Sequence, residues 1–291
     1  MNKHRLRVGI TVGDPSGIGP EITAKGLKQL KGLADFKVIG PSQKIFGVGK
    51  PRAEYGKAAI GYLDKALELI RNKQIDCLVT CPVSKEAVNL AGFKFSGHTE
   101  YLARRTGTKD FAMMLLNKEM RFSLVTRHIP LKDVPSSLNI KGIVKTVFLA
   151  CQGLKELFSI RNPRLAVCGL NPHASDNGLI GEEENKIIRP ALRKVKTKFK
   201  NIFGPFPADT AIARAREFDC VITMYHDQAL IPLKLSAKGT GVNLTLGLPF
   251  VRTSPLHGTA FDIAGKNRAD PGSFIEAVKL AIRCSLNQRS A

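Results

Sequence analysis

The stretch VITMYHDQALIPLK, residues 221–234, begins as an apolar run typical of a strand in the middle of a sheet and then breaks into Tyr225-His226-Asp227-Gln228. Two other strand-like runs end in the same way, FSLVTRH at His128 and RLAVCGLNPH at His173. In an open parallel sheet, ligands bind outside the carboxyl ends of the strands. Half of the six histidines are therefore predicted to lie at the edge of a sheet where ligands bind.

Strand-like and helix-like segments alternate along the whole chain. Strands are predicted at 6–12, 36–39, 77–80, 122–126, 165–169 and 220–224, and helices at 20–31, 58–72, 84–91, 141–158, 182–199 and 273–285. Strands rich in Val, Ile and Leu that alternate with helices indicate a mostly parallel sheet covered on both faces. The sequence therefore predicts an α/β protein.

Length and composition fit a globular protein. The chain has 291 residues, enough for one large or two medium domains, and 43% of them are hydrophobic. The six cysteines form no CxxC pair, and several lie inside apolar runs, so we expect all six to be reduced thiols. The first apolar run is too short for a signal-peptide core, and no run is long enough to cross a bilayer. These features predict a cytoplasmic protein.

The chain is strongly basic. It has 45 basic and 24 acidic residues, a net charge of +21, which suits nucleic acid, an anionic membrane surface or small anionic substrates. The densest basic stretch, RKVKTKFK at 193–200, reads as a solvated helix face and has no interleaved aromatic residues typical of nucleic-acid binding. We therefore expect neither nucleic acid nor a membrane as a partner.

Three imidazoles at one edge would suit zinc, cobalt or nickel, whereas magnesium prefers oxygen ligands. Each histidine taken singly also fits a hydrogen-bonded structural role. Asp227 or Asp209 is placed to orient a histidine or to accept a proton. Asp209 in FPADT equally fits the N-cap of the helix that follows it.

Two further histidines and a glycine-rich turn are candidates for ligand binding. His98 lies in SGHTEYLA, which also reads as the start of a helix, and His257 lies in PLHGTAFDIAGK, a loop with small residues. Gly13, Gly17 and Gly19 in ITVGDPSGIGPEI fit either a tight structural turn or a phosphate-binding turn. Their spacing is not GxGxxG, and no Walker lysine follows.

Seven sequence blocks, taken together, resemble the 4-hydroxythreonine-4-phosphate dehydrogenase family of pyridoxine phosphate biosynthesis. They are GDPSGIGPEI, TCPVSKE, SGHTEYLA, GLNPHASDNG, FPADT, MYHDQALIPLK and GVNLTLGLPFVRTSPLHGTAFDIAG. The chain is more distantly similar to isocitrate and isopropylmalate dehydrogenases. That resemblance implies two α/β/α domains with an active-site cleft between them. We expect a discontinuous first domain at 1–90 plus 266–291, and a second domain at 91–265 that carries the metal and substrate ligands.

The resemblance also implies roles for individual residues. The metal ligands would be His128, His173 and His226. The substrate contacts would be His98, Thr99, Lys234, Asn243 and Arg252, and the cofactor contacts His257, Gly258, Thr259 and Asp262. A carboxylate at Asp262 would favour NAD over NADP. The family is homodimeric, with its active site at the subunit interface.

The implied reaction is that of an oxidoreductase using NAD and a divalent metal ion, zinc, cobalt or magnesium. It oxidises 4-(phosphooxy)-L-threonine at the C3 hydroxyl and then decarboxylates the product to 3-amino-2-oxopropyl phosphate. Lys234 or Asp209 is the candidate base. A dehydrogenase of 4-phospho-D-threonate or 4-phosphoerythronate is the nearest alternative. A metal-dependent phosphoester hydrolase is another, although Asp262 and its loop favour a dehydrogenase.

One region departs from the family pattern. Typical members have several dozen more residues where this chain has only GPSQKIFGVGKPRAEYG, residues 40–56. The shortening affects the first domain and lies away from the residues matched as ligands.

Overall fold

The computed structural model describes residues 5–41, 48–94 and 96–290. The shortened segment at 40–56 falls partly outside these residues, because 42–47 are not described. The chain divides into two compact units, one formed by Met1–Lys109 with Gly239–Ser290 and the other by Asp110–Lys238.

The first unit contains five strands of sheet. They are β1 (Arg7–Thr11), β2 (Asp35–Ile39), β3 (Cys77–Thr80), β9 (Val242–Leu246) and β10 (Val251–Pro255), in the order β2-β1-β3-β10-β9. β10 is parallel to β3 and antiparallel to β9, and the remaining pairs are parallel. Every residue of β3, β9 and β10 is buried, so both faces of this sheet are covered.

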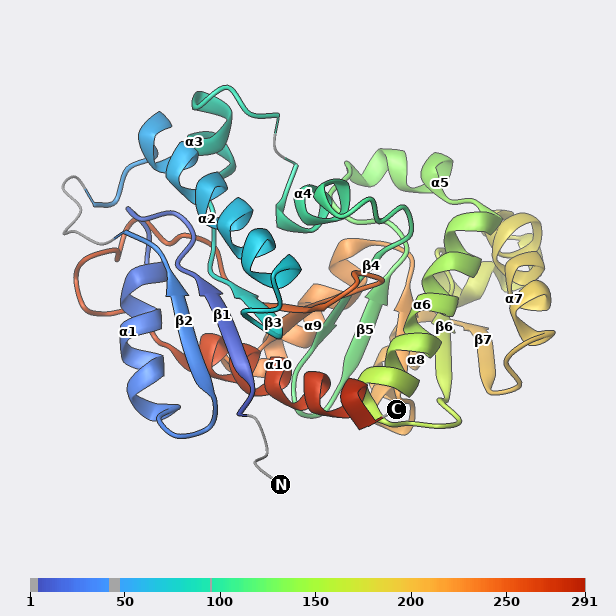
Figure 1. Cartoon of the computed structure of the whole chain (residues 1–291). Coiled ribbons are helices and arrows are strands. Elements are labelled where there is room, and N and C mark those ends of the chain that lie inside the picture. The colour runs from blue at the N-terminus through green and yellow to red at the C-terminus, as the bar shows by residue number, and fades with distance from the viewer. Residues whose placement is uncertain (1–4, 42–47, 95, 291) are drawn as a thin grey trace. The chain divides into compact units, whose positions relative to one another are not determined.

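Helices cover both faces of the first unit's sheet (Figure 1). They are α1 (Gly19–Gln29), α2 (Ala53–Arg71), α3 (Lys85–Leu90), α4 (His98–Arg105) and α10 (Gly272–Ser290). The chain moves outward from β1 to β2 and back from β2 to β3, and right-handed crossovers place α1 and α2 on opposite faces. α1 packs on α10 so closely that a Cβ at Gly26 would lie 2.5 Å from the Phe274 ring.

The second unit repeats the α/β pattern. Its strands are β4 (Ala112–Leu116), β5 (Arg121–Leu124), β6 (Leu165–Cys168), β7 (Ile202–Phe206) and β8 (Cys220–Thr223), in the order β4-β5-β8-β6-β7. β4 and β5 are antiparallel, and the pairs from β5 to β7 are parallel.

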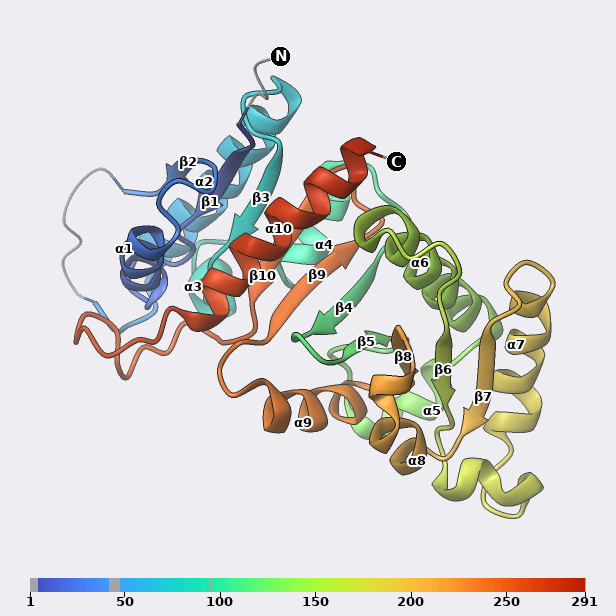
Figure 2. The ribbon, with the colours of Figure 1, turned by 90° about the horizontal axis from the view of Figure 1, so that it is seen from below.

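The helices of the second unit also lie on both faces, with α6 and α7 on one and α8 and α9 on the other (Figure 2). Their bounds are α5 (Val134–Ser137), α6 (Ile140–Phe158), α7 (Arg189–Lys196), α8 (Ala208–Ala213) and α9 (His226–Ala237). Four short helical turns complete the unit: η1 (Leu131–Asp133), η2 (Pro172–Gly178), η3 (Glu184–Ile188) and η4 (Ala215–Glu217).

The six predicted strands and six predicted helices are present, with ends that differ by a few residues. The predicted helix at 182–199 is divided into η3, which is a turn of π-helix, and α7. Four strands were not predicted. β7 contains Gly204 and Pro205, and β10 contains Arg252 and Pro255, residues that a local pattern reads as breaks in a strand.

The two units differ in their bounds from the predicted domains. Residues 91–109 and 239–265 were assigned to the second domain, whereas in the structure they belong to the first unit. The reason is tertiary: β10 pairs with β3, which is far away in the sequence, and β9 pairs with β10.

The cysteines confirm the prediction of free thiols. All six are unpaired and buried. Burial raises the pKa of Cys77 and Cys81 to about 12, so these side chains stay neutral and act as small hydrophobes. Among the residues that the structure describes, no helix combines the length and the apolar character that crossing a bilayer would require.

Candidate functional site

The three strand-end histidines follow three adjacent strands of the second unit. β5, β8 and β6 are neighbours and run parallel, so their carboxyl ends lie at one edge of the sheet. His128 follows β5, His226 is the first residue of α9 directly after β8, and His173 lies in η2 after β6.

His128 and His226 lie close together. Their ring centroids are 5.4 Å apart, and the rings are tilted by 49°. The Nδ1 atom of His226 is 2.6 Å from Oδ1 of Asp227, which leaves Nε2 of His226 for another ligand. A carboxylate on the far nitrogen is the arrangement that orients metal-binding histidines. These two residues therefore fit a divalent metal ion of the kind that binds imidazole.

His173 is held in an unusual backbone. Residues 173–177 all have positive φ, between 43° and 71°, and none of them is glycine. The residue is exposed. Across the described ranges, no group of three or more His, Cys, Asp or Glu side chains is arranged to hold a metal ion. The structure thus pairs two of the three predicted ligands, and the complete triad stays a prediction.

The two candidate bases are both exposed residues of the second unit. Asp209 lies in the first turn of α8, where its Oδ1 accepts a hydrogen bond from the backbone N of Thr210 at 2.7 Å. The N-cap of α8 is Pro207, so the alternative role of Asp209 as an N-cap is wrong. Lys234 lies on α9, two turns beyond His226, about 12 Å along the helix axis.

A buried guanidinium forms the centre of the candidate substrate site in the first unit. Arg252 on β10 is 1% exposed. It donates to Thr80 Oγ1 at 2.6 and 3.1 Å, to Thr245 Oγ1 at 3.0 Å and to Thr99 Oγ1 at 3.3 Å. Within the described part of the chain, none of its hydrogen bonds goes to a carboxylate. Burial lowers the pKa of Arg252 to about 10, so the group stays cationic near neutral pH.

His98 and Asn243 add polar atoms near this cation. His98 begins α4, as predicted, although the N-cap is Gly97. Burial, followed by the charge of Arg252, lowers the pKa of His98 to about 3, so the imidazole is neutral at physiological pH. The Oδ1 atom of Asn243 is buried and has no hydrogen-bond partner among the residues that the structure describes. A buried acceptor of this kind costs free energy unless a ligand or water satisfies it.

The glycine-rich turn and the His257 loop contact each other in the first unit. Ile18 N donates to Thr259 O at 3.0 Å, and a Cβ at Gly17 would lie 3.0 Å from the same oxygen. The Nε2 atom of His257 is buried and finds no hydrogen-bond partner within the described ranges, whereas Gly258 and Asp262 are exposed. The His257 loop therefore carries the exposed carboxylate of Asp262 and contacts the glycine-rich turn through the backbone of Thr259.

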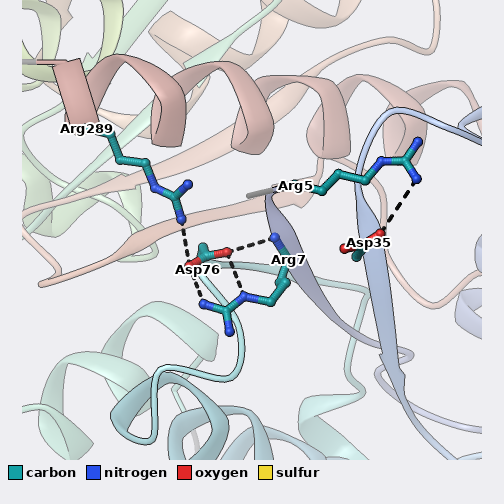
Figure 3. Close-up of a pocket in the computed structure, with 5 residues that line it drawn as sticks. All are labelled: Arg5, Arg7, Asp35, Asp76 and Arg289. Atoms are coloured by element: carbon teal, nitrogen blue, oxygen red, sulfur yellow. Dashed lines mark hydrogen bonds and ion pairs between the residues drawn. The ribbon is translucent and has the colours of Figure 1, made fainter. Parts of the chain in front are cut away.

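A pocket of about 400 Å³ lies where strands β1, β2 and β3 of the first unit begin, at their amino ends. Its lining consists of Arg5, Arg7, Asp35, Asp76 and Arg289 (Figure 3). Asp76 binds Arg7 at 2.9 Å and Arg289 at 2.8 Å, and these contacts tie the end of α10 to the starts of β1 and β3. Ligands of parallel sheets bind at the carboxyl ends of strands. We interpret this pocket as an ion-paired surface of structural importance.

Sequence reasoning missed several polar residues that are buried near the candidate sites. Thr80 and Thr245 bind Arg252, and Glu184 and Gln228 bind the segment before His173. The signal was present for Thr80, Gln228 and Thr245, which are polar residues inside the quoted blocks, whereas Glu184 lies outside them, in the predicted helix at 182–199. Nothing in the neighbouring sequence indicated which groups these side chains would bond to.

The fold is that of an α/β protein built from two α/β units. A solved isocitrate dehydrogenase from Methylococcus capsulatus shares the fold, with a TM-score of 0.58 at 16% identity over 98% of this chain and 87% of that chain. The model of the family described as "Pyridoxal phosphate biosynthetic protein PdxA" matches residues 18–281. The chain belongs to this family, which confirms the resemblance seen in its sequence blocks.

Individual relatives agree with this assignment. The 4-hydroxythreonine-4-phosphate dehydrogenase of Sulfurihydrogenibium sp. (strain YO3AOP1) is 43% identical over 95% of this chain and 98% of that protein. A crystal structure of the Klebsiella pneumoniae enzyme of that name has a TM-score of 0.87 at 34% identity, covering 98% of this chain and 99% of that one. The Burkholderia vietnamiensis enzyme of the same name is 38% identical over 331 aligned positions, which cover 100% of this chain and 100% of that protein.

Proposed function

We propose that the protein is an NAD-dependent and divalent-metal-dependent dehydrogenase. It oxidises 4-(phosphooxy)-L-threonine at the C3 hydroxyl and decarboxylates the product to 3-amino-2-oxopropyl phosphate. The relatives that carry the name 4-hydroxythreonine-4-phosphate dehydrogenase support this substrate. The observation that carries the proposal is the buried cation of Arg252, whose hydrogen bonds go to hydroxyl groups and which therefore favours an anionic ligand.

In this proposal the first unit binds the substrate and the cofactor. Arg252 supplies positive charge, and the hydroxyl of Thr80 keeps its proton to donate to an anion. The hydroxyls of Thr99 and Thr245 share a hydrogen bond at 3.5 Å, which leaves one proton of this pair for an anion. Neutral His98 and Asn243 bind further polar groups of the substrate. His257, Gly258, Thr259 and Asp262 would hold NAD, with the carboxylate of Asp262 on a ribose hydroxyl.

The second unit supplies the reacting groups. His128, His173 and His226 would hold a zinc, cobalt or magnesium ion, and imidazole ligands favour the first two. When bound, such an ion supplies a Lewis acid that lowers the pKa of a substrate alcohol, and NAD supplies the electron acceptor. Asp227 orients His226, and Lys234 or Asp209 accepts the alcohol proton. The homodimer and the cytoplasmic location stay predictions.

Parallel assays test the proposed substrate. NADH formation is followed at 340 nm with 4-(phosphooxy)-L-threonine and with 4-phospho-D-threonate, after EDTA treatment and again after addition of zinc, cobalt or magnesium. We expect metal-dependent turnover that is faster with phosphothreonine. A solved terephthalate dihydrodiol dehydrogenase, 28% identical with a TM-score of 0.68, shows that relatives with other named substrates exist. Preference for phosphothreonate would support the alternative substrate, and phosphate release without NADH would support a hydrolase.

Substitution of a predicted ligand tests the metal. We expect His226→Ala to lower metal-dependent turnover by about 100-fold or more, which is the scale of losing an essential catalytic group. Its far-UV circular dichroism should match the wild type, because the side chain is partly exposed at the start of α9. Near-normal activity of this variant in added cobalt would refute the triad.

A further inference from the structure

The carboxylate of Glu184 is buried and satisfied by one short segment of chain. The residue lies at the start of η3 and is 0% exposed. Its Oε1 accepts from Leu170 N at 2.7 Å and Asn171 N at 2.8 Å, and its Oε2 accepts from Asn171 Nδ2 at 2.9 Å. Among the described residues, its hydrogen bonds all come from positions 170 and 171. Burying a carboxylate without a cation is costly, so these three bonds must hold the segment firmly.

The segment held in this way leads directly to His173. Residues 170–171 connect β6 to η2, where five consecutive residues have positive φ. Such a backbone costs roughly 1–2 kcal/mol per non-glycine residue, so it persists only when the surrounding structure fixes it. Additional bonds fix the far side of the turn, from Ile180 N to Ser175 O at 3.0 Å and from Asn185 Nδ2 to Asn177 O at 3.2 Å.

A second buried side chain joins the same segment to the element that carries His226. Gln228 on α9 donates from Nε2 to Gly169 O at 3.1 Å, and its Oε1 accepts from Met224 N at 2.8 Å. A Cβ at Gly169 would lie 2.9 Å from Glu184 Oε1, so the carboxylate packs against this backbone. The end of β6 is therefore fixed from both sides, by Glu184 and by Gln228.

We propose that Glu184 is a positioning residue that holds the left-handed turn at 173–177 in place and so directs His173 toward the metal ion. This inference rests on the proposed function, since it assumes that His173 is a metal ligand. Glu183 offers a matched control. Its carboxylate accepts from the side chain of the same Asn171 at 2.8 Å but binds neither backbone N–H of 170 nor of 171.

Cobalt binding to the metal-free protein tests the inference without relying on turnover. Glu184→Gln keeps the volume of the side chain but removes its negative charge. The amide NH2 group that replaces Oε2 is a donor, so it cannot accept the hydrogen bond from Asn171 Nδ2. We expect its Co²⁺ dissociation constant, measured from the visible absorption of the ion, to rise about 10–100-fold, the usual cost of losing an outer-shell partner. Glu183→Gln should stay within about threefold of the wild type, since its bond involves only a side chain.

Amide hydrogen exchange gives a second measurement that needs no metal. In Glu184→Gln the amides of Leu170 and Asn171 should exchange faster than in the wild type, while those of β8 should be unchanged. Gln228→Met serves if Glu184→Gln does not fold, because it releases the same segment from the side of α9 and should also weaken cobalt binding.

The possible outcomes separate the two proposals. If the wild type binds no cobalt, or if His173→Ala binds it as well as the wild type does, the proposed metal site is wrong. If His173→Ala loses cobalt but Glu184→Gln binds it with wild-type affinity and spectrum, only the positioning role is wrong. Equal weakening in Glu184→Gln and Glu183→Gln would also overturn that role.

Discussion

Arg252 carries a positive charge in the interior of the first unit, surrounded by three threonine hydroxyls. A buried cation is tolerated only when its hydrogen bonds are satisfied, and hydroxyls satisfy them without neutralising the charge. The guanidinium of Arg252 therefore provides a fixed positive charge that an anionic group of the substrate would neutralise. Its fork of donors also holds the threonine hydroxyls in fixed orientations.

We expect Arg252→Lys to raise KM for the phosphorylated substrate by about 10–100-fold, because an ammonium cannot make the four bonds of the guanidinium, and each bond to a charged group contributes about 1.5–3 kcal/mol. Steady-state kinetics measures the effect. Arg104→Lys, at an exposed position of α4, is the control and should leave KM unchanged. An unchanged KM in Arg252→Lys would show that the cation does not contact or polarise the substrate site.

His98 links this site to the pH dependence of stability. Its pKa is lowered to about 3 in the folded protein, mainly by burial, from an ordinary value of 6.5. Below pH 6.5 the unfolded chain gains a proton that the folded protein does not, so stability falls as the pH falls from about 6.5 toward 3. Above pH 6.5 His98 is neutral in both the folded and the unfolded chain, so it has no effect on the pH dependence of stability there.

Urea denaturation at pH 7 and pH 5 checks this effect. We expect the free energy of unfolding of the wild type to fall more over this interval than that of His98→Gln, by about 1 kcal/mol, since the residue keeps some contact with solvent. Burial also lowers the pKa of His257, which contributes in the same direction in both proteins. Identical pH dependence in the two proteins would contradict the burial of the His98 ring.

At the scale of elements, the first βα turn is shaped by contacts that exclude side chains. Gly13 has φ of 73°, and a Cβ at Gly19 would lie 1.9 Å from Val12 O. Gly17 is less crowded, because the atoms nearest to an added Cβ belong to the backbone and side chain of Thr259, at 3.0 and 3.1 Å. At Gly13 and Gly19 the turn therefore has no room for a side chain, and between them Gly17 contacts Thr259 of the candidate cofactor loop.

Gly17→Ala tests the role of that loop. The added methyl group must push Thr259 by a few tenths of an ångström, so we expect KM for NAD to rise about fivefold with little change in KM for the substrate, a cost on the order of 1 kcal/mol. Gly61→Ala on α2, where a Cβ meets nothing within 4 Å, is the control. It should leave both KM values unchanged and stabilise the helix by about 0.5–1 kcal/mol. Equal KM for NAD in both variants would argue against a cofactor role for the loop.

At the scale of the whole molecule, the net charge of +21 matters for the encounter with anionic ligands. Both the phosphorylated substrate and the dinucleotide are anions, and a strongly positive protein attracts them over distances that salt shortens.

We expect kcat/KM for the phosphorylated substrate to fall several-fold between about 50 and 300 mM NaCl, because the Debye length shrinks from about 14 to 6 Å. The kcat value should change much less, since bound substrate no longer depends on long-range attraction. Steady-state kinetics in a salt series measures both. A kcat/KM that is independent of salt would show that the surface charge has no part in substrate capture.

The amino-acid sequence alone determined the α/β class, because the alternation of apolar strands with amphipathic helices is a local pattern. It also identified three histidines at the ends of strands, since each follows its own apolar run. The relative positions of those strands needed the fold: β5, β8 and β6 are neighbours in the sheet, although β8 follows β7 in the chain.

The tertiary structure alone decided the remaining features of the sites. Arg252 bonds to Thr80 and Thr99, which lie 172 and 153 residues away in the sequence, and β10 pairs with the equally distant β3. Even the contact of Glu184 with Asn171, 13 residues away, joins two different elements and has no local signal. Local propensity says which segments form helices and strands. Which buried polar groups satisfy one another is settled only when the chain packs, because an unsatisfied hydrogen-bonding group becomes costly only after water has been excluded.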